Sequence, residues 1–205
     1  MTAGVKAGGF ILAGGRSRRM GRDKALLQFD GIPLIECALA TMRGVADRVW
    51  IAGRRPDLVD FAPVIEDRYE ECGPLSGIEA ALASSPYDLN LFLPVDTPFV
   101  PPRLLQWMLA RAANSGAVAT IPVAGGEPQP LIAVYSRRLL SGLSHAIQAG
   151  RLKSIDAMVA ASSGHGGADL FRVEMVSRFF PISNPVNAGR WFANLNTPDD
   201  LRLNP

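Results

Sequence analysis

Short, continuous apolar runs alternate with amphipathic segments along this chain, and this alternation constrains the fold more than any other feature. Runs such as 9–13, 48–52 and 89–95 lack the alternation of a half-exposed strand, which is typical of strands buried on both faces of a sheet. Strand and helix in regular succession predict an α/β fold with a doubly wound, mostly parallel sheet and right-handed connections. The predicted strands are Gly9–Ala13, Arg48–Ala52, Pro63–Glu66, Leu89–Val95, Ala117–Val123 and Leu131–Tyr135, and the predicted helices are Leu34–Met42, Leu75–Ala83, Arg103–Ala113 and Arg138–Gln148.

The length of the chain predicts a single domain over residues 1–205, because a chain of this size can bury a substantial core. No internal repeat with a period of roughly 20–50 residues is visible. The Gly- and Ser-rich stretch AASSGHGGA, Ala160–Ala168, predicts a mobile surface loop without a domain boundary.

Composition and charge exclude several classes of protein. The net charge of +2 is too small to indicate a nucleic-acid partner, and no apolar stretch approaches the roughly 20 residues of a membrane-spanning helix. Cys37 and Cys72 are too few and too far apart for a disulfide framework or a cysteine-ligated metal site, and His145 and His165 have no metal ligands near them in sequence. We expect a cytoplasmic protein, because the arginine pair at 18–19 lacks the apolar segment of an export signal.

The segment after the first predicted strand is strongly basic. Gly14 and Gly15 end the strand, and four arginines and a lysine follow between residues 16 and 24. In open α/β sheets, ligands bind beyond the carboxyl ends of the strands, and paired glycines let backbone N–H groups approach an anion closely. The segment matches neither G-x-x-x-x-G-K-[ST] nor G-x-G-x-x-G. A longer, arginine-bearing phosphate loop is one interpretation, and a solvated basic loop is the other.

A carboxylate, Asp96, follows the most apolar predicted strand and precedes Thr97-Pro98. At the end of a buried strand, a carboxylate can hold a hard cation such as Mg²⁺ against phosphate oxygens. The alternative is that Asp96 only caps the turn into the helix predicted after Pro101. Of the two, we expect the metal role.

Five blocks of sequence stand in one order along nearly the whole chain. The first, LAGGRSRRMGRDKALLQFDGIPLIE at 12–36, carries the pattern L-A-G-G-x-S-x-R-M-G-x-D-K. The others are IEDRYEECGPLSGI at 65–78, LPVDTPFVPP at 93–102, EPQPLIAVY at 127–135 and NLNTPDDL at 194–201. Together these blocks resemble the nucleotidyltransferases, and most closely the MobA-type molybdenum cofactor guanylyltransferases.

The resemblance implies a Rossmann-like nucleotidyltransferase fold and an enzyme of molybdenum cofactor biosynthesis. Enzymes of this family use Mg²⁺ to join the GMP of GTP to the phosphate of the molybdopterin form of the cofactor, and pyrophosphate leaves. GTP and a molybdopterin-type cofactor are therefore the implied substrates, with transient contact to cofactor-synthesis proteins or molybdoenzymes. We expect a monomer that acts without nucleic acid or membrane.

Positions that match the family's motifs carry its functional residues onto this chain. Arg19 and Lys24 are the expected catalytic cations, because a lysine neutralises phosphate as a point charge and an arginine can hold two oxygens at once. Asp96 is the expected catalytic residue that binds Mg²⁺, and Asp67 matches a GTP-contacting aspartate. The expected nucleotide- and cofactor-binding residues are Leu12, Ala13, Gly14, Gly15, Lys24, Gly53, Asp67, Gly73, Pro74, Leu75, Gly77, Asp96, Asn194 and Asn196.

Two parts of this set have a second interpretation. The backbone of 73–77 is expected to read the edge of the guanine, or else it only leads into a helix. The side chains of Asn194, Asn196 and Asp199 suit a pterin or its phosphate, and the same segment can also cap a helix that begins near Pro198.

One position departs from the family. Gly53 stands where family members commonly have Asn, in contexts such as Asn-Ala-Asn-Arg, so no side-chain amide is available there. We expect Arg54 or the backbone to compensate. The acceptor site must take a phosphorylated partner, and we expect the 129–130 pair, Arg151 and Lys153 to border it.

Two alternatives to guanylyl transfer stay open. One is another transferase of the same fold, a cytidylyltransferase or a sugar-phosphate nucleotidyltransferase; the cytidine enzymes resemble L-A-A-G where this chain has L-A-G-G at 12–15. The other is a non-catalytic nucleotide- or cofactor-binding carrier, which would bind without releasing pyrophosphate and would not need Asp96. A dehydrogenase is disfavoured by the missing dinucleotide fingerprint.

Overall fold

The computed structural model describes residues 5–14, 23–177 and 188–195, and its strands form one large sheet and one small hairpin. The strands are β1 (Ala7–Leu12), β2 (Gln28–Phe29), β3 (Ile32–Pro33), β4 (Arg48–Ala52), β5 (Val64–Ile65), β6 (Leu89–Pro94), β7 (Ala119–Ala124), β8 (Glu127–Pro128), β9 (Ala133–Ser136) and β10 (Ala168–Arg172). The α-helices are α1 (Leu34–Arg43), α2 (Pro74–Ser84), α3 (Pro102–Ser115), α4 (Leu140–Gln148), α5 (Ser154–Ser162) and α6 (Val173–Ser177). Short 3₁₀ helices are η1 (Lys24–Leu26), η2 (Pro56–Leu58), η3 (Arg137–Leu139) and η4 (Ala188–Phe192).

The large sheet has eight strands and runs in the order β10-β7-β9-β6-β1-β4-β5, with β8 paired to β7. Strands β6, β1, β4 and β5 are parallel to their neighbours, and so are β7 and β10. Strand β9 is antiparallel to both β6 and β7, and β8 is antiparallel to β7. The predicted fold class, an α/β fold with a mostly parallel sheet, is therefore confirmed.

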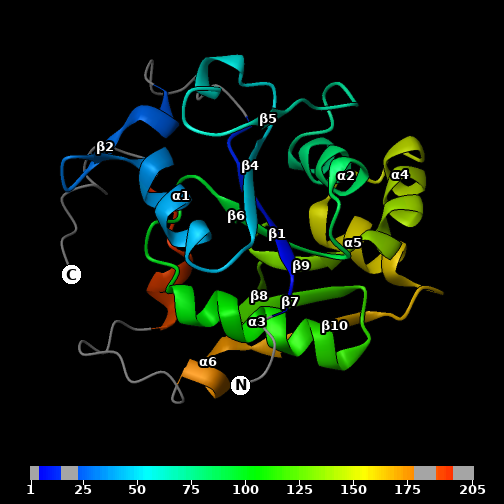
Figure 1. The fold of residues 1–205 in the computed structure, drawn as a ribbon. Coiled ribbons are helices and arrows are strands. Elements are labelled where there is room, and N and C mark those ends of the chain that lie inside the picture. The colour runs from blue at the N-terminus through cyan, green and yellow to red at the C-terminus, as the bar shows by residue number, and fades with distance from the viewer. Residues whose placement is uncertain (1–4, 15–22, 178–187, 196–205) are drawn as a thin grey trace.

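Helices cover both faces of the sheet (Figure 1), as in a doubly wound fold. Helices α1 and α3 lie on one face, and α2, α4 and α5 lie on the other. The side chains of successive β1 residues point to opposite faces of the sheet, because side chains alternate along a strand. Ile11 packs into the core under α1 and α3, whereas Phe10 and Leu12 pack into the core under α2 and α4.

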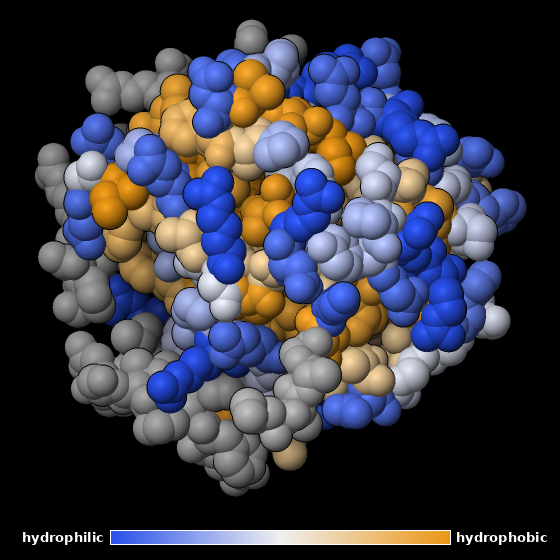
Figure 2. All heavy atoms as spheres, in the orientation of Figure 1, coloured by the Kyte–Doolittle hydropathy of each residue, from blue (hydrophilic) through white to orange (hydrophobic). Residues whose placement is uncertain are grey.

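Aromatic rings strengthen the second of these cores. Phe10 stacks between Trp50 of β4 and Phe92 of β6, with ring centroids 5.2 Å apart in both pairs. Such pairs add about 0.5–1.5 kcal/mol beyond the apolar area that they bury. Figure 2 shows hydrophilic side chains mainly on the right side of this face of the molecule and apolar side chains in its middle.

The ends of two helices are set by proline and glycine. Helix α2 follows Gly73, which has a φ of +59°, and carries Pro74 in its first turn. Helix α3 also begins with a proline, Pro102, and ends at Gly116 in the left-handed region, with a φ of +70°. Proline suits the first helical turn because its missing N–H has no intrahelical partner there, and glycine adopts positive φ without steric cost. Among the described residues, no helix is long and apolar enough to cross a membrane.

The prediction of a surface loop over Ala160–Ala168 is wrong at both ends. Residues 160–162 form the last turn of α5, and Ala168 begins β10, so the connection is 163–167. Ala161 and Ser162 are buried, and the Ser162 hydroxyl donates to the Met158 carbonyl at 2.6 Å. The abundance of Gly and Ser suggested a loop, but burial of the small side chains against α4 stabilises a helix there.

Candidate active site

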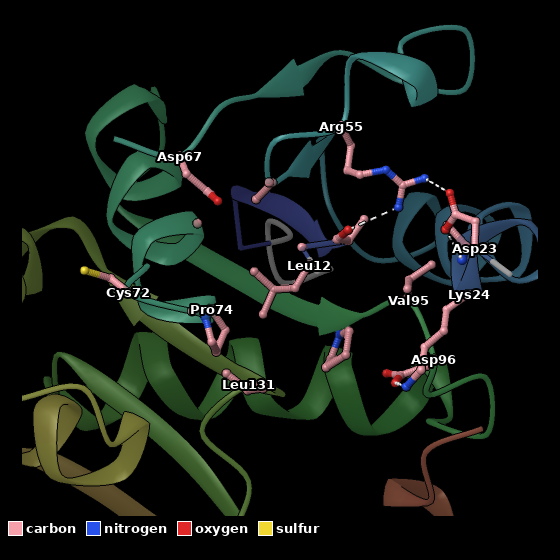
Figure 3. A pocket seen from close by; sticks show the side chains of 18 of the residues that line it. Leu12, Asp23, Lys24, Arg55, Asp67, Cys72, Pro74, Val95, Asp96 and Leu131 are labelled. Atoms are coloured by element: carbon pink, nitrogen blue, oxygen red, sulfur yellow. Dashed lines mark hydrogen bonds and ion pairs between the residues drawn. The ribbon is translucent and has the colours of Figure 1, made fainter. Parts of the chain in front are cut away.

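A pocket of about 750 Å³ opens beyond the carboxyl ends of β1, β4 and β6 and beside the first turn of α2. Figure 3 shows side chains from these elements pointing into it. The location agrees with the general placement of ligands in open α/β sheets. The residues that line it are Leu12, Ala13, Gly14, Asp23, Lys24, Ala25, Ala52, Gly53, Arg55, Asp67, Tyr69, Glu71, Cys72, Gly73, Pro74, Gly77, Pro94, Val95, Asp96 and Leu131.

The sequence predicts a set of site residues, and most of those that the structure describes line this pocket. They come from six separate stretches of chain: Leu12, Ala13, Gly14, Lys24, Gly53, Asp67, Gly73, Pro74, Gly77 and Asp96. Leu75 does not line the pocket, because its side chain is fully buried in the core under α2. Gly15, Arg19, Asn196 and Asp199 lie outside the described residues.

Lys24 and Asp96 meet at one end of the pocket. The Lys24 Nζ lies 2.9 Å from the Asp96 Oδ2, although the two residues are 72 positions apart in sequence. Both side chains are mostly buried, with 23% and 16% of their surfaces exposed. The contact follows from the pairing of β1 with β6, which brings the segments beyond these two strands together.

The turn that carries Asp96 is held by hydrogen bonds on both sides. The Val95 N–H donates to the Leu12 carbonyl at 3.1 Å, and the Thr97 hydroxyl donates to the Pro94 carbonyl at 2.8 Å. The Leu195 N–H donates to the Asp96 carbonyl at 2.9 Å, so the segment that contains Asn194 lies against this turn. Asn194 itself does not line the pocket. Asp96 is also too far from α3 to cap it, since the residue before that helix is Pro101.

The residues near Asp96 fit a bound Mg²⁺ of the kind that nucleotides bring. Among the described residues, no group of three His, Cys, Asp or Glu side chains forms a ready-made metal site. Magnesium does not need one, because it commonly takes one or two carboxylates together with substrate phosphates and water. Asp96 offers such a carboxylate at the edge of the pocket, within reach of a lysine that can share a phosphate.

Asp67 lies in the pocket wall, on the segment that leads into α2. Its Oδ1 is buried and has no hydrogen-bond partner among the described residues. Burial raises the pKa of this carboxyl, and the charge of Arg54 lowers it to a smaller extent. A buried acceptor without a donor is costly, so this oxygen is suited to accept from a ligand.

Gly77 explains how Asp67 can lie so close to α2. A Cβ added at Gly77 would stand 3.3 Å from the Asp67 Oδ1. Further support comes from Ser76, whose hydroxyl accepts the Tyr69 N–H at 2.9 Å. The 67–69 segment therefore packs against the first turn of α2, where the N–H groups of the helix face the pocket with a partial positive charge.

Gly53 brings the end of β4 against the end of β1. Its φ is +136°, outside the region that asparagine tolerates. A Cβ there would lie 3.0 Å from the Gly14 N and 3.1 Å from the Gly14 Cα. The absence of an asparagine at this position thus has a steric reason in this chain. The expected compensation by Arg54 stays a prediction; its guanidinium is exposed and hydrogen-bonds to Glu70 at 3.2 Å.

Arg55 is a functional candidate that the sequence motifs do not indicate. It is 3% exposed, lines the pocket and binds the carboxylates of Asp23 and Asp57. The hydrogen bonds to Asp57 and the nearby charge of Asp23 raise the pKa of its guanidinium. A pair of adjacent arginines gave no sign that one is exposed and the other buried. The aspartate two residues after Arg55 was the available signal.

The remaining unpredicted lining residues are Asp23, Ala25, Ala52, Tyr69, Glu71, Cys72, Pro94, Val95 and Leu131. Of the residues expected at the acceptor site, Gln129 and Pro130 immediately precede the pocket residue Leu131. Arg151 and Lys153 are exposed, lie just before α5 and do not line the pocket. Their role at an acceptor site stays a prediction.

Comparison with known proteins agrees with the fold. Residues 9–164 match the family model described as the MobA-like NTP transferase domain. A protein of Pelotomaculum thermopropionicum named "Probable molybdenum cofactor guanylyltransferase" is 34% identical over 96% of this chain and 91% of its own length. A protein of the same name from Methanothermobacter thermautotrophicus is 32% identical over 94% of this chain and 96% of its own.

A solved structure supports the same relationship. The crystal structure of molybdopterin-guanine dinucleotide biosynthesis protein A from Archaeoglobus fulgidus superposes with a TM-score of 0.75, at 26% identity and with 95% of each chain covered. The match in sequence extends over the strands and loops that build the pocket. This chain belongs to the MobA-like nucleotidyltransferase family.

Proposed function

We propose that this protein transfers GMP from GTP to the phosphate of a molybdopterin-type cofactor and releases pyrophosphate, with Mg²⁺ as its metal. Membership of the MobA-like family makes nucleotidyl transfer its class of reaction. The observation that carries the proposal is the Lys24–Asp96 pair, with 2.9 Å between Nζ and Oδ2, at the end of a pocket beyond the parallel strands. A cation and a metal-binding carboxylate side by side suit a triphosphate.

In the proposed reaction, an oxygen of the acceptor phosphate attacks the α-phosphorus of GTP. A new P–O bond forms to the acceptor, and the bond from the α-phosphorus to the oxygen that bridges to the β-phosphorus breaks. The protein contributes position and charge to such a transfer rather than covalent chemistry. Lys24 would neutralise phosphate oxygens as negative charge builds on the leaving pyrophosphate.

Asp96 would hold Mg²⁺ through its carboxylate. When bound, the ion would supply positive charge to the phosphate oxygens and to the pyrophosphate as it leaves. Asp96 is poised for this role because its carboxylate is mostly buried and its turn is fixed by the Thr97 hydroxyl.

The nucleoside would lie toward α2. Backbone N–H groups of the 73–77 turn would face the purine, and the Asp67 Oδ1 would accept a hydrogen bond from the nucleoside. The unpartnered state of that buried oxygen among the described residues supports this assignment. Guanine offers an N–H and an amino group on one edge, and an aspartate can accept from both.

A thermal-shift experiment tests the choice of base. The melting temperature would be measured with GTP, CTP, ATP and UTP, each with Mg²⁺ at equal concentration. A ligand that binds only the folded state stabilises by RT ln(1 + [L]/Kd), so we expect the largest rise with GTP. Equal shifts with all four nucleotides would overturn the guanylyl assignment, and a largest shift with CTP would favour the cytidylyl alternative.

Pyrophosphate release distinguishes an enzyme from a carrier. With GTP, Mg²⁺ and a molybdopterin-type acceptor, we expect release that depends on the acceptor. Binding of GTP without release would support the carrier alternative. We further propose that the chain acts as one domain and as a monomer in the cytoplasm, with transient contact to cofactor-synthesis proteins or molybdoenzymes, and light scattering of the purified protein would test the monomer.

A further inference from the structure

Arg55 is a buried arginine in the wall of the pocket, and the family resemblance gave it no role. Its side chain is 4% exposed. The Nε donates to Asp57 at 3.0 Å, and the Nη2 donates to Asp57 at 2.7 Å and also to Asp23. The Nη1 donates to the Ala13 carbonyl at 3.3 Å. Figure 3 shows the guanidinium between the Asp23 carboxylate and the end of β1.

These contacts suit a role in holding protein groups rather than a substrate anion. Four of the five N–H groups of the Arg55 guanidinium are donated to protein oxygens. Among the described residues, the carboxylates of Asp23 and Asp57 share the Arg55 guanidinium. The guanidinium is therefore already paired with protein carboxylates, which disfavours a phosphate at Arg55 itself.

The contacts lead from Arg55 to Lys24 through Asp23. The Asp23 Oδ1 accepts the Ala25 N–H at 3.0 Å and so caps η1, whose first residue is Lys24. The other carboxylate oxygen of Asp23 binds Arg55. Because Asp23 caps η1 and is itself held by Arg55, it restricts the conformation of this 3₁₀ turn. The direction of the Lys24 side chain is restricted with it.

The contact with Ala13 ties the same guanidinium to the end of β1. The Ala13 N–H donates to the Ala52 carbonyl at 3.1 Å, so the ends of β1 and β4 are also joined directly. Arg55 thus connects three segments that the pocket requires: the end of β1, the connection after β4, and η1.

We propose that Arg55 is a positioning residue, which fixes Asp23 and thereby holds Lys24 where it meets a nucleotide triphosphate. The proposal depends on the proposed function in one respect, that Lys24 binds the phosphates of GTP. Arg55 itself does not touch the substrate in this account. Because the proposal assigns the effect of Arg55 on GTP binding to the Asp23–Lys24 segment, most of that effect should disappear when Lys24 is absent.

A double-mutant cycle on GTP affinity tests this dependence. The dissociation constant of GTP with Mg²⁺ would be measured by calorimetry for Arg55→Lys and Asp23→Asn, each alone and combined with Lys24→Ala. We expect each substitution alone to weaken binding about tenfold, and by less than about twofold when Lys24 is already alanine, because residues that act through one another are not additive. Arg111→Lys is the matched control, since Arg111 forms a bidentate pair with Asp169 at 2.6 and 2.8 Å outside the pocket.

Asp23→Asn makes the test sharp and also covers the case in which Arg55→Lys does not fold. Asparagine keeps the side-chain oxygen that caps η1 but loses the charge that binds Arg55. Simple electrostatics predicts tighter GTP binding, because a negative charge near the triphosphate is removed; positioning by Arg55 predicts weaker binding. Unchanged or tighter binding by Asp23→Asn would overturn the proposal, as would equal losses with and without Lys24.

Amide hydrogen exchange gives a second readout that needs no nucleotide. We expect the Ala25 amide to exchange faster in Asp23→Asn and Arg55→Lys, by about tenfold or more, and unchanged exchange would count against positioning. Wild-type protein that binds no GTP at all would overturn the proposed function and this proposal together. If the wild-type protein binds GTP and Asp23→Asn binds it equally well, this proposal alone would be overturned.

Discussion

The two halves of the sheet are built from the same kinds of element and differ in the direction of their strands. In the half formed by β6, β1, β4 and β5, every strand runs parallel, so the carboxyl ends gather at one edge and lead into pocket residues. In the half formed by β9, β7 and β10, the antiparallel β9 breaks that arrangement. Among the described residues, this half contributes Leu131 to the pocket.

Each half also has a tight ion pair. Lys24 and Asp96 meet in the pocket of the parallel half, with 2.9 Å between Nζ and Oδ2. Arg111 and Asp169 meet in the other half at 2.6 Å, and the guanidinium of Arg111 lies over the ring of Trp107 at 5.3 Å. Similar chemistry therefore occurs in two settings, one that lines the pocket and one that joins α3 to β10. Paired substitutions can separate the two.

The largest expected difference concerns the two aspartates. Asp96→Asn keeps the shape of the side chain but loses the charge that would hold the metal, so the rate of pyrophosphate release should fall on the order of 10²-fold or more. Asp169→Asn, in the other half, should leave that rate within about twofold of wild type. Both rates would be measured with GTP, Mg²⁺ and a molybdopterin-type acceptor. Wild-type turnover by Asp96→Asn would show that the metal is held elsewhere.

The cations of the two pairs should separate activity from stability. Lys24→Ala removes the proposed contact to phosphate, and we expect turnover to fall roughly 10- to 100-fold, whereas the loss of its pair with Asp96 should cost on the order of 1 kcal/mol of stability. Arg111→Ala should keep its turnover and lose stability, on the order of 1 kcal/mol, because it removes an ion pair and a cation–π contact. The same loss of turnover as for Lys24→Ala is expected for Arg19→Ala. If Lys24→Ala lowers the melting temperature strongly and leaves the specific activity unchanged, the role of Lys24 is structural rather than catalytic.

Sequence patterns predicted the parallel half more fully than the other. The apolar runs at 9–13 and 89–95 correspond to β1 and β6 with small differences at their ends, because a strand buried on both faces must be apolar throughout. The direction of β9 could not be read from its run, since an apolar strand of a few residues looks alike in both directions. Helix α5 and strand β10 were missed because small residues and glycines separate them.

The site shows the same limit at the level of single residues. Lys24 and Asp96 could be proposed separately from their motifs, yet the contact between them depends on the pairing of β1 with β6. The burial of Arg55 could not be predicted, because Asp57 is a local signal but Asp23, 32 positions away, meets Arg55 only in the folded chain. Local patterns therefore identify charged candidates, and tertiary structure decides which of them are buried.

Two glycines test whether close backbone approach matters equally in the two halves. Gly53 and Gly166 both have positive φ, and an added Cβ would stand 3.0 Å from the Gly14 N and 2.9 Å from the Gly116 carbonyl oxygen, respectively. Alanine at either position should destabilise the protein by about 1–3 kcal/mol, measured by denaturant unfolding. Only Gly53→Ala should also weaken GTP binding, by a few-fold, because it displaces Gly14 in the pocket. Equal GTP affinity in Gly53→Ala and Gly166→Ala would show that the contact between Gly53 and Gly14 does not affect nucleotide binding.

The smallest expected effects concern two carboxyls with opposite pKa shifts. Burial raises the pKa of Asp67 in the parallel half. In the other half, the Gly125 N–H donates to the Glu174 carboxylate at 2.7 Å and lowers the pKa of that group. A raised pKa means that the folded protein binds the proton more tightly than the unfolded chain, so stability falls as pH rises from the unfolded pKa through the folded one. A lowered pKa gives the reverse, a contribution present above the unfolded pKa and lost as pH falls through the folded one.

Asp67→Asn should therefore raise the melting temperature of the nucleotide-free protein at pH 7, and Glu174→Gln should lower it, each on the order of 1 °C. Both differences should shrink when the pH is lowered below about 4, near the ordinary pKa of these groups. Adding GTP with Mg²⁺ separates the two further: the GTP-induced rise in melting temperature should be smaller in Asp67→Asn, which loses a charged acceptor in the pocket, and unchanged in Glu174→Gln. If Asp67→Asn is stabilised and still shows the full GTP shift, the nucleotide does not donate to the buried Asp67 oxygen, which lacks a partner among the described residues, and the carboxyl has another role.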